Sequence, residues 1–63
     1  MPPINVKEFS TNNPVPFTWN DTTIIPRIGE GIYDCQSGRS WNIKDVIYYV
    51  DKGEIYEITL FVE

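Results

Sequence analysis

The sequence predicts an all-β protein of one domain, residues 1–63, built as a small SH3-like barrel or as a strongly bent antiparallel sheet closed by a long C-terminal hairpin. Three observations predict this fold class. Residues 40–63 form two runs rich in β-branched and aromatic side chains around the dipeptide Lys52-Gly53, which is typical of a hairpin. The first run changes its alternation halfway, which predicts a β-bulge and a strong twist. No stretch keeps a helical period over the roughly ten residues that a helix needs.

The N-terminal half contains shorter predicted elements. Residues 4–9 alternate apolar and polar side chains and predict a first strand. Residues 10–16 (STNNPVP) predict a turn and extended backbone, because their two prolines are incompatible with a helix. The apolar alternation resumes at 17–19, and a turn is expected at 20–22. Residues 22–25 are β-branched throughout and predict another strand.

The stretch IIPRIGEGIYDC, residues 24–35, carries a Gly-x-Gly sequence that has two possible meanings. A dinucleotide-binding fingerprint needs a third glycine and a following helix, but position 34 is Asp34 and the next residues favour a strand. Gly29 and Gly31 are therefore interpreted as a tight corner from which the chain enters the sheet. The strand expected after this corner covers residues 31–35.

The sequence QSGR then predicts a turn, and the hairpin follows. Trp41 and Ile43 lie on one face of its first strand, whereas the apolar residues from Val46 onward have the opposite parity. A bulge at Lys44-Asp45 returns both groups to one core face. In the second strand the expected core stripe is Tyr56, Ile58, Leu60 and Val62, and the other stripe is Ile55, Glu57, Thr59 and Phe61.

Composition and charge argue against several classes of binding partner. The net charge is −4 and the isoelectric point is about 4.5, which argues against direct nucleic-acid binding and against adsorption to an anionic membrane. No apolar run approaches the ~20 residues of a membrane span, and residues 1–10 lack the basic and apolar regions expected of a signal peptide. The single cysteine, Cys35, allows no internal disulfide, and the absence of histidine disfavours a metal site. We expect a cytoplasmic protein without a cofactor.

Two short motifs carry a resemblance to a known group. PRIGE at residues 26–30 and WNIKDV at residues 41–46 resemble the "PR-hydrophobic-G-(D/E)" corner and the "Y/W-x-V/I-x-D-V" strand of small uncharacterised bacterial and phage β-domain proteins. The resemblance covers residues 24–63 and implies a strongly bent sheet or an SH3-like barrel, with no activity attached. The sequence departs from the pattern at Gly31 and in its Pro- and Asn-rich front end.

The sequence favours a non-enzymatic protein-binding module that associates with itself or with a host protein. Without histidine, a Ser-His or Cys-His nucleophile is excluded, and carboxylates beside hairpin turns more often keep strand edges from pairing. The aromatic residues exceed what one small core can hide, and surface tyrosines commonly anchor protein contacts. The candidate protein-contact residues are Tyr49, Phe61, Asp45, Asp51, Glu54 and Glu57.

The sequence is also compatible with two alternative functions. The clustering of acidic residues near the C-terminus fits an acidic phage-type inhibitor that occupies a basic, nucleic-acid-binding surface of a host defence protein, although the same charge also serves solubility. A peptide-binding adaptor of the SH3 type would need an aromatic groove.

Overall fold

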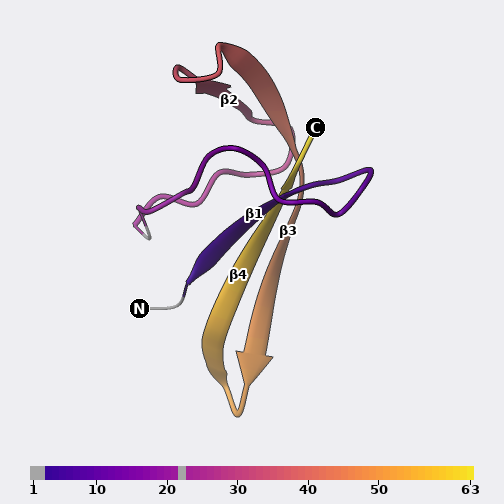
Figure 1. Cartoon of the computed structure of the whole chain (residues 1–63). Coiled ribbons are helices and arrows are strands. Elements are labelled where there is room, and N and C mark those ends of the chain that lie inside the picture. The colour runs from indigo at the N-terminus through magenta and orange to yellow at the C-terminus, as the bar shows by residue number, and fades with distance from the viewer. Residues whose placement is uncertain (1–2, 22) are drawn as a thin grey trace.

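The computed structural model describes residues 3–21 and 23–63, and these residues form an all-β fold with a single four-stranded mixed sheet (Figure 1). The sheet has the order β1-β4-β3-β2. Its strands are β1 (Ile4–Glu8), β2 (Gly31–Asp34), β3 (Arg39–Asp51) and β4 (Glu54–Val62). The all-β prediction is confirmed.

The C-terminal hairpin is the longest part of the sheet and is also confirmed. β3 and β4 run antiparallel and are joined by the predicted two-residue turn. Lys52 has a φ of 53° and Gly53 a φ of 82°, so both turn residues are left-handed, as a type I′ turn requires. This turn type matches the right-handed twist of the two strands and so favours the hairpin.

Two register shifts interrupt the hairpin. Ile43 pairs with Val62 and Asp45 with Phe61, which leaves Lys44 as the extra residue of the predicted bulge. A second shift leaves Tyr56 without a partner, since Tyr49 pairs with Glu57 and Val50 with Ile55. Tyr56 was predicted to be in the core, and that prediction is wrong: its side chain is 54% exposed because the second extra residue changes the parity of β4 at this point.

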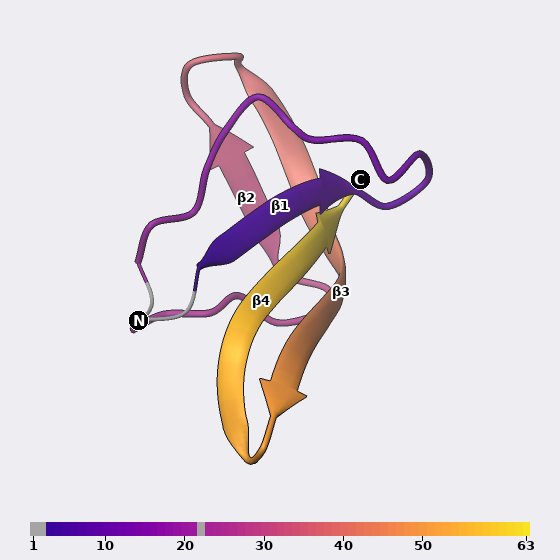
Figure 2. The same cartoon turned by 60° about the horizontal axis from the view of Figure 1, so that its bottom comes forward.

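The first strand pairs in parallel with β4, so the sheet is mixed and not purely antiparallel. β1 and β2 lie at opposite edges, and no pairing between them joins the described strands into a barrel (Figure 2). The SH3-like barrel is therefore not confirmed. β2 has only four residues and pairs with Arg39–Asn42, the part of β3 that extends beyond the β3–β4 ladder, and it has no pairing with β1.

The core lies on one face of the sheet and is covered by the chain between β1 and β2. Its buried side chains are Val6, Trp41, Ile43, Ile58, Leu60 and Val62. Residues 15–19 keep the apolar alternation that the sequence shows, and their apolar members pack against this core without forming a strand. The strand predicted at 22–25 is not formed by residues 23–25, and Thr22 lies outside the described residues. Proline at position 26 follows directly and is buried, so the segment enters the core as irregular chain.

The Gly-x-Gly stretch is a corner, as predicted. Gly29 has a φ of 92°, a conformation that favours glycine, whereas Gly31 has no positive φ and begins β2. The N–H of Gly29 donates to the carbonyl of Ile43 (2.9 Å), and the N–H of Ile43 donates to the carbonyl of Glu30 (2.9 Å). The corner is closed by the Glu30 N–H, which donates to the carbonyl of Arg27 (3.0 Å). Both backbone groups of Ile43 on this side of β3 are therefore occupied.

Candidate protein-contact surface

The distal part of the hairpin projects away from the rest of the fold. We call residues 45–57 the hairpin arm. Beyond Ile43, β3 is paired only with β4, and β1 pairs with β4 only from Ile58 onward. From Tyr49 to Glu57 the arm therefore extends past β1 as a two-stranded ribbon (Figures 1 and 2).

The arm carries an unusual number of exposed apolar and aromatic side chains. These are Tyr48 (48% exposed), Tyr49 (36%), Val50 (57%), Ile55 (46%) and Tyr56 (54%). Isolated exposed apolar residues are ordinary on a protein surface. Five of them lie on one short ribbon, distributed over its two faces, and exposed apolar surface of this extent is typical of interaction sites.

One face of the arm continues the core face of the sheet. Tyr48 pairs with the buried Ile58, and Val46 pairs with the buried Leu60, so these four side chains point to the same side. Val50 follows in the same alternation. We call this side the core face of the arm; it is apolar, and toward the turn it becomes exposed.

The opposite side, the outer face of the arm, is acidic. Asp45 and Asp51 lie there with Tyr49, since residues two apart in a strand share a face. Glu57 pairs with Tyr49 and Glu54 pairs with Asp51. Strict alternation would put Glu54 and Glu57 on opposite faces, but the extra residue Tyr56 between them brings both to the outer face. All four predicted acidic contact residues therefore share one face of the arm.

The predicted contact residue Tyr49 is exposed, as expected, and it contacts the bulge residue. The rings of Tyr49 and Tyr56 lie with their centroids 6.0 Å apart at an interplanar angle of 46°. Aromatic pairs at this separation are attractive beyond their buried area. The outer face therefore carries an aromatic pair as well as carboxylates.

Phe61, the remaining predicted contact residue, lies apart from the arm. It is half-buried, and its ring packs edge-on against that of Phe9, with centroids 6.4 Å apart. Its position beside Asp45 in the ladder places it at the base of the outer face. The structure thus groups five of the six predicted residues and puts Phe61 in a local aromatic contact.

The outer edge of β3 is open along the arm. On this edge β2 pairs with Arg39–Asn42, and the corner at Gly29 and Glu30 bonds to the backbone of Ile43. From Lys44 to Asp51 no described residue pairs with the edge. The N–H of Val46 donates to Oδ1 of the adjacent Asp45 (2.9 Å) and not to the carbonyl of a neighbouring strand. Because hydrogen-bonding groups alternate along an antiparallel pair, the N–H and C=O of Tyr48 and Val50 also point to this open edge.

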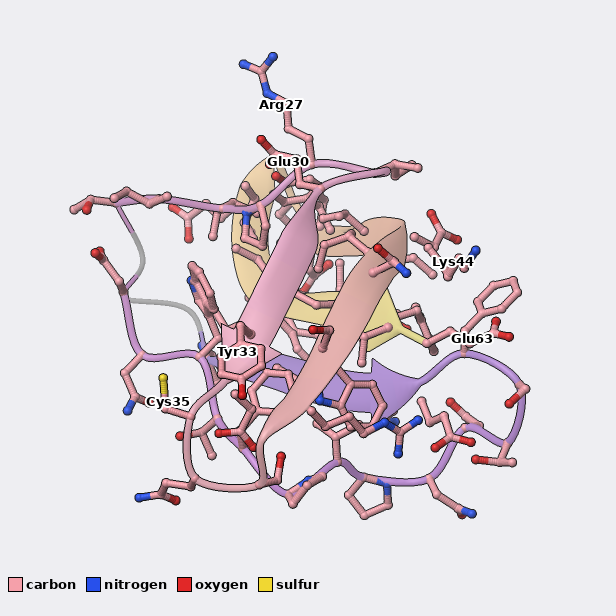
Figure 3. The ribbon with its side chains drawn as sticks, turned by 90° about the horizontal axis from the view of Figure 1, so that it is seen from above. Arg27, Glu30, Tyr33, Cys35, Lys44 and Glu63 are labelled. Carbon is pink, nitrogen blue, oxygen red and sulfur yellow. The ribbon has the colours of Figure 1, made fainter. Side chains whose placement is uncertain are left out.

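Other groups singled out in the sequence do not converge. Cys35 is exposed in the turn after β2. Figure 3 shows Tyr33 and Cys35 on one side of the molecule and Lys44 and Glu63 on the other. The part of the chain that the structure describes contains no pocket and no group of three metal-ligating side chains. No helix among the described residues could cross a membrane.

A second cluster surrounds Trp41 at the opposite end of β3. The guanidinium of Arg39 lies 3.7 Å above the ring centroid of Trp41, and the ring of Phe17 lies 5.8 Å away. The buried Nε1–H of Trp41 has no hydrogen-bond partner within the described residues. Trp19, in contrast, donates from Nε1 to the carbonyl of Asp21 (2.8 Å), so its half-buried indole holds the covering chain in place.

Sequence reasoning missed the open edge and the apolar core face of the arm. The available signal was the run VIYYV, which lies between Asp45 and Asp51 and contains no charge, glycine or proline. Comparisons with protein-family models, curated proteins and solved structures found no match to this chain.

Proposed function

We propose that this chain is a non-enzymatic protein-binding module whose contact surface is the hairpin arm. The observation that supports the proposal most is the coincidence, on one projecting ribbon, of five exposed apolar or aromatic side chains with an open strand edge. Tyrosine supplies large contact area at a small entropic cost and is enriched in protein interfaces. Strand addition at an open edge supplies backbone hydrogen bonds.

We also propose an origin, a cellular location and a class of partner for this protein. The resemblance at residues 24–63 favours a bacterial or phage origin, and a single cysteine fits a cytoplasmic protein. The partners are proteins, either a second copy or a host protein, and neither nucleic acid nor membrane is contacted directly. The net charge of −4 supports this choice of partner.

The test is a comparison of two pairs of exposed apolar residues. The arm variant carries Ile55→Ser and Tyr56→Ser, and the control variant carries Ile24→Ser and Ile28→Ser, which are 61% and 65% exposed outside the arm. Binding is measured as self-association by light scattering and as proteins retained on the immobilised chain. We expect the arm variant to lose both and the control to keep them. Equal behaviour of the two variants would contradict the proposal.

A second candidate function is favoured by the outer face. Asp45, Asp51, Glu54 and Glu57 share that face, so the arm presents four carboxylates on one side that a basic surface of a host protein could accept. An acidic inhibitor of this kind weakens strongly as salt screens the charges, whereas association through apolar side chains and strand pairing does not. A complex that dissociates between low and high salt would favour the inhibitor.

A further inference from the structure

The open edge of β3 has the composition of a pairing strand. Natural sheets protect such edges with charges, prolines or bulges. In β3 the bulge at Lys44 and the charges of Asp45 and Asp51 protect only the two ends, and the five residues between them are uncharged. Parallel in-register stacking of many chains would place each of these aspartates against its own copy, which disfavours fibrils. The edge is thus suited to a finite antiparallel contact.

The occupant best supported by the structure is a second copy of the chain. Two identical edges can pair antiparallel around a twofold axis, and the contact then closes. On the edge, Tyr48 and Val50 are 48% and 57% exposed, and pairing of two edges would cover part of both side chains.

Geometry and charge restrict how two copies can pair. The hydrogen-bonding residues of one edge must face those of the other, so the twofold axis passes through a residue and not between two residues. With Ile47 on the axis, the extra residue Lys44 would bring Val50, whose N–H and C=O point outward, opposite Ile43 of the second copy. The backbone groups of Ile43 are already bonded to Glu30 and Gly29, so the corner blocks this register.

With Tyr48 on the axis, like charges would face each other. Asp45 would lie opposite Asp51 of the second copy, and this pair would occur twice in the dimer. Like charges directly opposite in a ladder are destabilising. An axis closer to the turn than Tyr49 leaves fewer residues paired. One register remains.

We propose that two copies pair through the open edges of β3 with Tyr49 on the twofold axis; this inference rests on the proposed function of the arm. Tyr48 then pairs with Val50 of the second copy, and their outward N–H and C=O groups bond to each other. Lys52 comes opposite Val46 of the second copy, whose N–H is held by the Asp45 carboxylate. The lysine ammonium therefore approaches an opposite charge.

The register predicts which single cysteine forms a disulfide between copies. Tyr49 pairs with Glu57 within the hairpin, so its own N–H and C=O point away from the second copy. Two such residues directly opposite have Cα atoms about 4.5 Å apart, within the range of a disulfide. Ile47 of one copy would instead be about 13 Å along the strand from Ile47 of the other.

The experiment uses Tyr49→Cys and Ile47→Cys, each in the full chain with Cys35→Ser to remove the exposed native thiol. After mild oxidation we expect a covalent dimer of Tyr49→Cys and at least tenfold less of Ile47→Cys. Equal cross-linking of both variants, or preferential cross-linking of Ile47→Cys, would overturn the register.

Light scattering of the wild-type chain keeps the inference testable if a cysteine variant fails to fold. We expect a dimer whose fraction rises with concentration, and a monomer for Tyr48→Lys, which places a charge on the edge. A wild-type chain that stays monomeric at millimolar concentration would overturn the inference. In that case the proposed function would still stand if the arm variant, and not the control variant, lost retained host proteins, and it would fail if neither lost any.

Discussion

The two halves of β3 have different surroundings, although they belong to one continuous strand. The N-terminal half, Arg39–Ile43, has β2 and the corner on one edge, and its Trp41 and Ile43 are buried under the covering chain. The C-terminal half has only β4 beside it, and its apolar side chains from Tyr48 to Val50 are exposed. The difference shows that similar β-forming sequence serves as core in one half and as free surface in the other, depending on what covers it.

The largest expected effect is the removal of a core side chain that the first half packs against. Leu60 is fully buried, so Leu60→Ala loses apolar contacts and leaves a cavity that costs about 2–5 kcal/mol. A chain of this size has little stability to spare, and we expect the variant to be largely unfolded at 25 °C. Circular dichroism in urea measures the loss. Val50→Ala on the arm is the control and should change the free energy of unfolding by less than about 0.5 kcal/mol; equal losses would contradict the comparison.

A smaller effect is expected at the turn that ends the arm. Gly53 has a φ of 82°, and a Cβ at this position meets no atom within 4 Å, so the cost of Gly53→Ala is conformational. We expect a loss of about 1–2 kcal/mol. Gly31→Ala provides the control, because Gly31 has no positive φ and its Cβ would lie 3.8 Å from the Trp41 carbonyl, an ordinary contact. Thermal unfolding should show a larger loss of stability for Gly53→Ala than for Gly31→Ala. A larger loss for Gly31→Ala would contradict the conformational cost assigned to Gly53.

Lys52→Asn separates the stability of the hairpin from its association. Lys52 has a φ of 53°, which asparagine tolerates better than lysine, so the isolated chain should gain up to about 1 kcal/mol. The substitution also removes the charge that we place next to Asp45 of a second copy, so dimerisation should weaken. Unfolding at low concentration and light scattering at high concentration measure the two effects. Tighter association of the variant would show that Lys52 does not contribute to the contact.

The smallest effect concerns pH and the covering chain. The side-chain hydroxyl of Thr23, and then its backbone N–H, donate to Asp21 and lower the pKa of that carboxyl below 3.8. A depressed folded-state pKa contributes stability that is present above the unfolded pKa and is lost as the pH falls through the folded value. Asp21→Asn should therefore be slightly less stable than the wild type at pH 7, and the difference should vanish in strong acid. A stability difference that persists in strong acid would show that the substitution acts through lost packing and not through the charge of Asp21.

The hairpin was predictable because its signals are local. The Lys52-Gly53 turn, the alternation on either side and the parity change at Lys44 lie within one contiguous stretch, and each is visible in the residues alone. The corner at Gly29 was predictable for the same reason. These elements account for most of the sheet.

The remaining features depend on contacts between distant parts of the chain. Nothing in residues 4–8 specifies that β1 pairs in parallel with β4, and the covering chain packs as irregular structure where its β-branched residues predict a strand. The second bulge at Tyr56 carries no glycine or proline that would indicate it, and without this bulge strict alternation would put Glu54 and Glu57 on opposite faces. The acidic residues of the contact surface could be named from the sequence, but their common face could not.

The most direct test of the account is amide hydrogen exchange along β3 at two protein concentrations. In dilute solution the N–H groups of Tyr48 and Val50 should exchange fast and those of Ile47 and Tyr49 slowly, because only the latter bond to β4. At millimolar concentration the exchange of Tyr48 and Val50 should slow markedly as the open edges pair. Uniform protection along β3 in dilute solution would contradict the open edge, and unchanged exchange of Tyr48 and Val50 at high concentration would contradict its role in association.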